Sequence, residues 1–253
     1  MRMPGPTLLV VLSVVLLAGC GAQQAPSGQG AEPGGANGQV GTDGQAGAAS
    51  AANGIEKLPA QEALSRAKKA FIGAPGVHVV FSARAEKTTA DIQLQGNDRA
   101  SVSMAKEGET VKVTVVGSVA YLRTKDLGDQ WIKTSTSDKD YAKFSPLTKR
   151  DQLFQEFVTN AAKPPMTSGP GGKVNGHDSV KLASGTVAIY LATDADPYPL
   201  RVVDTADNGG TVDFIGYGTQ MAITEPPASK VVSGSRPGAR SKAARSPGAS
   251  PSA

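Results

Sequence analysis

The stretch that decides the fold is residues 99–124, RASVSMAKEGETVKVTVVGSVAYLRT. Its apolar residues recur at every second position, as Val111 and Val113 do on either side of a lysine. Alternation with a period of two is typical of a strand that buries one face and leaves the other in water. Gly108 and Gly117 interrupt the pattern where short turns would join antiparallel neighbours. The stretch therefore predicts three adjacent strands of an antiparallel sheet.

The same alternation continues on both sides of this stretch. Further strands are predicted at 77–83, 91–95, 130–133, 173–175, 179–182, 186–192, 200–204 and 211–216. Spacings of three and four between apolar residues predict helices at 59–71, 138–144 and 151–162. A segment rich in glycine and proline, residues 164–172, predicts a loop before the second run of strands. The fold class is therefore α+β, with about ten strands and two or three helices.

The predicted sheet has a larger apolar face than the predicted helices can cover. About ten strands spaced 4.8 Å apart make a sheet roughly 48 Å wide, whereas a helix is only about 10 Å across. The sheet must therefore curve, with the helices plugging its concave face. Such a cover favours a cavity for an apolar ligand, and the alternative is a fully packed core. The candidate lining residues are the inward-facing Val79, Phe81, Ile92, Leu94, Met104, Val113, Leu122, Phe154, Phe157, Ile189 and Phe214.

The first 19 residues have the pattern of a secretion signal. An apolar core from Leu8 to Leu17 is too short to span a bilayer and has the length of a signal-peptide core. It ends in Leu17-Ala18-Gly19-Cys20, which resembles the lipobox of bacterial lipoproteins. Cys20 is the only cysteine, so no disulfide framework explains it. We expect cleavage before Cys20, lipidation of its thiol and anchoring to the extracellular face of the cell membrane. The alternative is an ordinary signal with an incidental cysteine.

Composition divides the rest of the chain into three parts. Residues 20–54 carry the lipidated cysteine and a flexible tether of Gly, Ala and Gln. Residues 55–225 hold every aromatic residue and form the predicted domain, and residues 226–253 form a basic tail expected to be disordered. Of the chain's 26 basic and 22 acidic residues, 20 of each lie in the domain. A neutral domain argues against nucleic-acid binding. The tail could contact anionic lipids or wall polymers, or simply aid solubility.

Catalytic and metal-binding patterns are weak. His177-Asp178 could form part of a catalytic triad, but no Gly-x-Ser-x-Gly elbow accompanies it. No paired cysteines, His-x-x-x-His or calcium loop occurs, so no metal and no cofactor is expected. Asp194 and Asp196 before Pro197 favour a turn. We therefore expect a protein that is not an enzyme, with an esterase-like hydrolase as the third possibility after a carrier and a packed interaction protein.

Three segments carry a family resemblance. Val119–Arg123, Gln130–Lys133 and Asp196–Arg201, in this order of elements, resemble the LppX/LprG lipoproteins of actinobacteria, over residues 56–217 and the lipobox. That family shares the half-barrel of the LolA and LolB lipoprotein carriers. The resemblance implies an apolar cavity that holds acyl chains of an envelope lipid or lipoglycan, for transport or presentation outside the membrane. The alternative is an envelope interaction lipoprotein with a packed core and no ligand.

Overall fold

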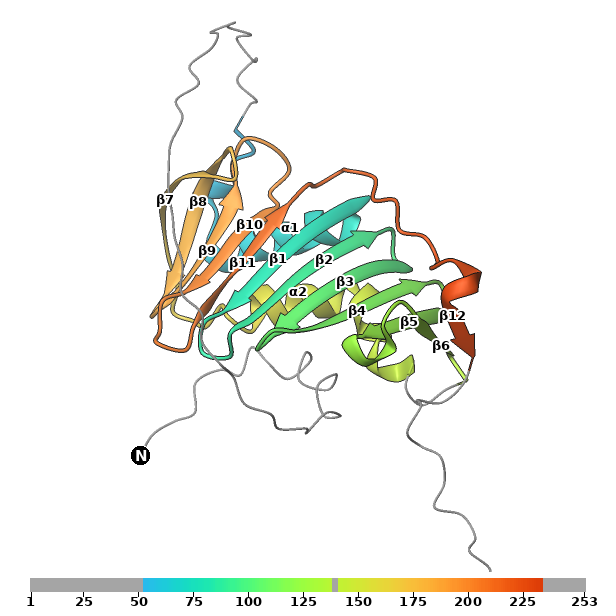
Figure 1. Ribbon diagram of the computed structural model, residues 1–253. Coiled ribbons are helices and arrows are strands. Elements are labelled where there is room, and N and C mark those ends of the chain that lie inside the picture. The colour runs from blue at the N-terminus through green and yellow to red at the C-terminus, as the bar shows by residue number, and fades with distance from the viewer. Residues whose placement is uncertain (1–51, 138–140, 234–253) are drawn as a thin grey trace, which may run out of the picture.

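The computed structural model describes residues 52–137 and 141–233 (Figure 1). The strands are β1 Gly76–Ala83, β2 Thr88–Gln95, β3 Arg99–Lys106, β4 Glu109–Val116, β5 Val119–Thr124, β6 Trp131–Ser135, β7 Thr167–Val174, β8 His177–Ser184, β9 Val187–Ala192, β10 Pro199–Asp204, β11 Gly210–Ile215 and β12 Val231–Ser233. The helical segments are η2 Ile55–Lys57, α1 Ala60–Gly73, η3 Lys125–Leu127, η4 Tyr141–Lys143, η5 Ser145–Thr148, α2 Arg150–Phe154, η6 Gln155–Thr159 and η7 Ala228–Lys230.

All the described strands belong to one curved sheet. Their order is β12-β6-β5-β4-β3-β2-β1-β11-β10-β9-β8-β7, so the two runs of strands meet where β1 pairs with β11. Neighbours pair antiparallel, except that β12 runs parallel to β6. The predicted α+β class and the curved, half-barrel sheet are confirmed. The sheet has twelve described strands, compared with about ten in the prediction.

The strand register explains why one face of the sheet is apolar. Val79 lies opposite Ile92, which lies opposite Val102, and the row continues through Val113 to Leu122. Rows of this kind form because side chains of the same phase point to one face in every paired strand. We call this the inner face, because the helical segments pack on it, and we call the opposite one the outer face.

The cover on the inner face consists of α1 and of the continuous segment α2–η6. Both lie on the same side of the sheet, behind it in the view of Figure 1. The ring of Phe71 from α1 has its centroid 5.7 Å from that of Phe154 and 5.8 Å from that of Phe214. The ring centroid of Phe157 in η6 lies 6.1 Å from that of Phe81 in β1. Helices and sheet therefore share one aromatic and aliphatic interior.

Two predicted helices are shorter or less regular than expected. The region 138–144 contains only the 3₁₀ turn η4 among its described residues, and residues 138–140 lie outside the described part. The predicted helix 151–162 is five residues of α-helix followed by a π-helical turn, Gln155–Thr159. Such a widened turn is rare and occurs often at functional sites.

The loop predicted at 164–172 is partly wrong, because Thr167–Val174 is strand β7. Pro170 and three glycines suggested a loop, but β7 is an edge strand, where a missing N–H can face away from the sheet. A register shift between Pro170 and Gly172 accommodates them. At Gly171 a Cβ atom would lie 2.3 Å from Ser179 Oγ, so the strand needs glycine there.

The segment after β11 forms a strap that runs past the ends of the central strands. Figure 1 shows it in orange and red, running from β11 past the ends of the central strands to β12. We define the strap as residues 217–233. The Met221 amide donates to Gln95 Oε1 at 2.6 Å, and Arg99 Nη1 donates to the Ile223 carbonyl at 3.0 Å. Composition assigned everything after residue 225 to the tail, yet Val231–Ser233 completes the sheet.

Candidate functional site

The residues predicted to line a cavity come together on the inner face. Of the eleven, ten have side chains no more than 4% exposed and belong to one apolar cluster, and Leu122 packs against it partly buried. Nine of the eleven come from strands, Phe154 comes from α2 and Phe157 from η6. The sequence therefore located the interior between sheet and cover correctly. Whether these side chains line a ligand or pack on one another stays a prediction.

The two parts of the cover are joined by one buried cation, Arg150. Its side chain is 3% exposed, and Nη1 donates to the carbonyls of Phe71 and Ala74 while Nη2 donates to that of Pro75 at 3.3 Å. These carbonyls lie in the last turn of α1 or directly after it and need such donors. Arg150 Nε has no hydrogen-bond partner among the described residues. Burial lowers the pKa of Arg150, and the guanidinium still carries its charge.

Polar attachment of the cover to the sheet is sparse. The side-chain hydrogen bonds of described residues in α1 and α2–η6 stay within these segments or reach the turn after α1, as Arg66–Glu62, Gln155–Asn160 and the Arg150 bonds do. Contact with the strands is apolar. Apolar contact is non-directional, so it does not fix one separation between cover and sheet in the way that hydrogen bonds would.

An open hollow lies between α1 and the loop that joins β9 to β10. Its volume is about 530 Å³, and it is lined by Asn53, Ile55, Arg66, Lys69, Ala70, Gly73, Asp196, Pro197 and Tyr198. Ile55 is part of the apolar cluster and Tyr198 packs against it, so the floor of the hollow continues into the interior. Arg66 and Lys69 are exposed at its rim. We call it the α1 groove.

The sequence analysis missed Tyr198, which lines the α1 groove, and Tyr217, which stacks on it. Tyr198 and Tyr217 stack with ring centroids 4.0 Å apart and an angle of 11° between the planes. The Tyr217 hydroxyl donates to the Pro199 carbonyl at 2.7 Å. Burial raises the pKa of Tyr217 well above its usual value, Tyr198 adds to the shift and the charge of Arg150 opposes it. The available signal was Asp196–Arg201, which contributed only to the family resemblance.

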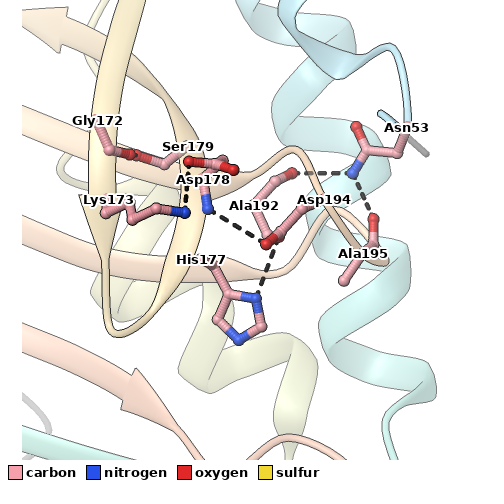
Figure 2. A network of polar contacts seen from close by, with 9 residues as sticks. All are labelled: Asn53, Gly172, Lys173, His177, Asp178, Ser179, Ala192, Asp194 and Ala195. Carbon is pink, nitrogen blue, oxygen red and sulfur yellow. Dashed lines mark hydrogen bonds and ion pairs between the residues drawn. The ribbon is translucent and has the colours of Figure 1, made fainter. Parts of the chain in front are cut away.

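A polar network holds the loop beside the α1 groove (Figure 2). Asp194 accepts from the Asp178 amide at 3.3 Å, and its other carboxylate oxygen lies 3.1 Å from His177 Nδ1. Burial alone would raise the pKa of Asp194, but these hydrogen bonds and the His177 charge bring it below its usual value. Asn53 Nδ2 donates to the Ala192 carbonyl at 2.9 Å and also to that of Ala195. The network therefore fixes where the chain enters the domain.

This network does not have the geometry of a catalytic triad. Ser179 Oγ donates to the Gly172 carbonyl at 2.7 Å, and His177 contacts Asp194 instead of Asp178 (Figure 2). Asp178 pairs with Lys173 at 2.9 Å. Within residues 52–137 and 141–233, no group of three His, Cys, Asp or Glu side chains could hold a metal ion. In the same ranges no helix is both long and apolar enough to cross a bilayer. Cys20 lies outside the described residues.

Comparisons with known proteins gave matches among solved structures only. No family model and no curated protein matches the chain. Among solved structures, LprF from Mycobacterium bovis is 15% identical with a TM-score of 0.43, covering 66% of this chain and 96% of LprF. The lipoprotein LppX from Mycobacterium tuberculosis is 14% identical with a TM-score of 0.42, and the match covers 65% of this chain and 100% of LppX. MucB is 16% identical with a TM-score of 0.32, covering 67% of this chain and 60% of MucB.

LprF and LppX are mycobacterial lipoproteins of the LppX/LprG family, which is the family that the sequence resembles. Identities and TM-scores at this level assign neither an activity nor a ligand.

Proposed function

We propose that this chain is a protein anchored by lipid to the extracellular face of the cell membrane, and that it binds the acyl chains of an envelope lipid or lipoglycan between sheet and cover. The observation that carries the proposal is the apolar attachment of α1 and α2–η6 to the inner face. A cover held in this way can move outward along apolar surface without leaving buried donors or acceptors unpaired. Acyl chains would replace the contacts that the cover gives up.

The α1 groove supplies the route into this space. Its floor reaches the apolar cluster at Ile55 and Tyr198, and its rim is polar. An amphiphile could place its apolar part inward and its headgroup at the rim in one orientation. The role is one of binding, with no catalytic step, and it requires neither a metal nor a cofactor. Anchoring through Cys20 would keep the groove near the source of the ligand.

The competing proposal is an envelope interaction lipoprotein with a fully packed interior. The burial of the predicted lining residues fits both proposals, since a closed carrier and a packed core look alike in the absence of ligand. Native mass spectrometry separates them. The chain from residue 21 onward, purified from an actinobacterial host, should carry a lipid that organic solvent removes. A lipid-free protein that also takes up no added lipid would support the packed core.

A substitution at Leu94 tests where the lipid binds. Leu94→Trp adds bulk to the inner face, whereas Gln93→Trp adds the same bulk to the outer face one residue earlier in β2. We expect Leu94→Trp to reduce bound lipid at least tenfold and Gln93→Trp to leave it unchanged. Circular dichroism and thermal unfolding establish that both fold, and Val113→Trp replaces Leu94→Trp if that variant does not. Equal lipid content in both folded variants would contradict an inner-face site.

A further inference from the structure

One side of helix α1 faces the α1 groove. Its contribution to the lining consists of Arg66, Lys69, Ala70 and Gly73, and spacings of three and four residues place these on one stripe of the helix. Ala70 and Gly73 are small, and a Cβ atom added at Gly73 would meet no atom of another segment within 4 Å. The groove therefore leaves open space beside the last turn of α1.

Positive charge exceeds negative charge in the described lining of the groove. The cations are Arg66 and Lys69, and the carboxylate is Asp196. Asp196 already accepts a hydrogen bond from the Tyr198 hydroxyl at 3.0 Å. Arg66 pairs with Glu62 at 3.1 Å, but this pair is exposed and contributes little energy. Among the described residues, Lys69 forms no ion pair, so its ammonium group is available to an anion in the groove.

A third positive charge lies behind the inner end of the groove. Arg150 is buried and donates to carbonyls just before and just after the groove residue Gly73. Within residues 52–137 and 141–233 it has no carboxylate partner, and its Nε–H is unpaired. The charge of Arg150 acts on Tyr217, which stacks on the groove residue Tyr198. The buried guanidinium therefore has no opposite charge to balance it.

This arrangement favours an anion beside the end of α1. The last turn of a helix normally disfavours an anion, because its free carbonyls carry partial negative charge. Arg150 occupies these carbonyls and brings a full positive charge to them. A buried charge without an opposite charge is costly, and a negative group placed nearby reduces that cost.

We propose that the α1 groove selects amphiphiles that carry an oxyanion, a carboxylate or a phosphate, and holds it against Lys69 and Arg66 in front of Arg150. Lysine and arginine bind such oxygens through charge-assisted hydrogen bonds. The acyl chain would continue past Ile55, where the floor of the groove joins the apolar cluster. This inference rests on the proposed function, because it names the headgroup class of the same ligand. A neutral headgroup would leave the excess charge of the groove unbalanced.

Two pairs of probes test the selection on the full mature chain carrying Cys20→Ser, expressed without the signal peptide so that it has no acyl anchor. The carboxylate pair is cis-parinaric acid and its methyl ester, both measured by their own fluorescence. The phosphate pair is oleoyl lysophosphatidic acid and monooleoylglycerol, measured by displacement of bound probe. We expect the charged member to bind about tenfold more tightly than the neutral member in at least one pair. The pair with the larger ratio identifies the source of the oxyanion.

Variants of adjacent lysines on α1 locate the charge that is responsible. Lys69→Gln removes a cation of the groove and should weaken the charged probes about fivefold, with the neutral probes unchanged. Lys68→Gln removes the same charge one residue earlier, outside the described lining, and should change neither. Arg150→Gln, checked for folding by circular dichroism, should lower the ratio of charged to neutral affinity. The ratio is the readout, because a looser cover would affect both members of a pair alike.

The outcomes separate this inference from the proposed function. Uptake of charged and neutral members with equal affinity in both pairs would overturn the oxyanion site and leave a carrier of acyl chains. No uptake of any probe would overturn the proposed function and this inference with it. Equal weakening by Lys68→Gln and Lys69→Gln would assign the selection to net charge instead of the groove. An unchanged ratio in folded Arg150→Gln would remove the buried cation from the site.

Discussion

The two faces of the sheet are stabilised by different kinds of contact. The inner face meets its cover through apolar side chains that are almost all fully buried. The outer face and the strand ends carry directional bonds, such as His78 to Asp91 at 2.8 Å and Arg201 to Asp213 at 2.6 Å, and the bonds of the strap. Hydrogen bonds specify one geometry, whereas apolar contact tolerates several. The difference indicates that the movable part of the proposed carrier lies on the inner face.

The largest expected effect comes from truncating the centre of the cover. Phe71 is fully buried and touches Phe154 of the cover and Phe214 of the sheet. We expect Phe71→Ala to lower the free energy of unfolding by about 3 to 5 kcal/mol, through lost burial and the cavity left behind. Its neighbour Ile72 is 36% exposed, so Ile72→Ala should cost less than about 0.5 kcal/mol. Urea denaturation measures both, and similar losses would mean that α1 does not pack as described.

A smaller effect is expected from removing the cation that joins the two parts of the cover. Arg150→Leu keeps bulk but leaves the carbonyls of Phe71, Ala74 and Pro75 without this donor. An unsatisfied buried polar group costs about 1 to 3 kcal/mol, and we expect a loss of about 2 kcal/mol in unfolding free energy. Arg66→Leu, which removes an exposed pair with Glu62, should cost less than about 0.5 kcal/mol.

The same variant sharpens the comparison of the two faces. If Arg150 only holds α1 to α2–η6, Arg150→Leu should speed hydrogen exchange in these helices and leave β1 to β5 unchanged. Uniformly faster exchange in both helices and strands would show that the cover and the sheet unfold as one unit. That result would remove the structural basis for a separately moving cover.

The sequence predicted the central strands well because their alternation follows directly from burial on one face. Strand β4, Glu109–Val116, and strand β1, Gly76–Ala83, both contain the predicted ranges. Strand β7 was missed because its glycines and proline indicate a loop, and only its place at the sheet edge makes a strand possible. Arg150 gave no signal, since a basic residue beside an apolar stripe normally faces water. Contacts between segments distant in sequence decide such cases.

The smallest of these effects concerns the strap and depends on pH. The strap covers Tyr121 on the outer face of β5, where the phenol is 2% exposed and forms a hydrogen bond with Glu225. Burial, this hydrogen bond and the negative charge of Glu225 raise the pKa of Tyr121 to about 12. Since the folded pKa exceeds the usual 10.0, the folded state holds the proton more tightly. The contribution to stability is complete below pH 10 and is lost as pH rises toward 12.

Tyr121→Phe removes the hydroxyl and keeps the ring. At neutral pH we expect a loss of about 1 kcal/mol in unfolding free energy, the typical net value of one buried hydrogen bond. Between pH 10 and 12 the stability of the wild type should fall more steeply than that of the variant, which lacks this titrating group. Tyr190→Phe on β9, outside the strap, serves as the matched control. Parallel pH curves for wild type and Tyr121→Phe would show that the strap does not bury this hydroxyl, and the outer face would then lose one of its directional contacts.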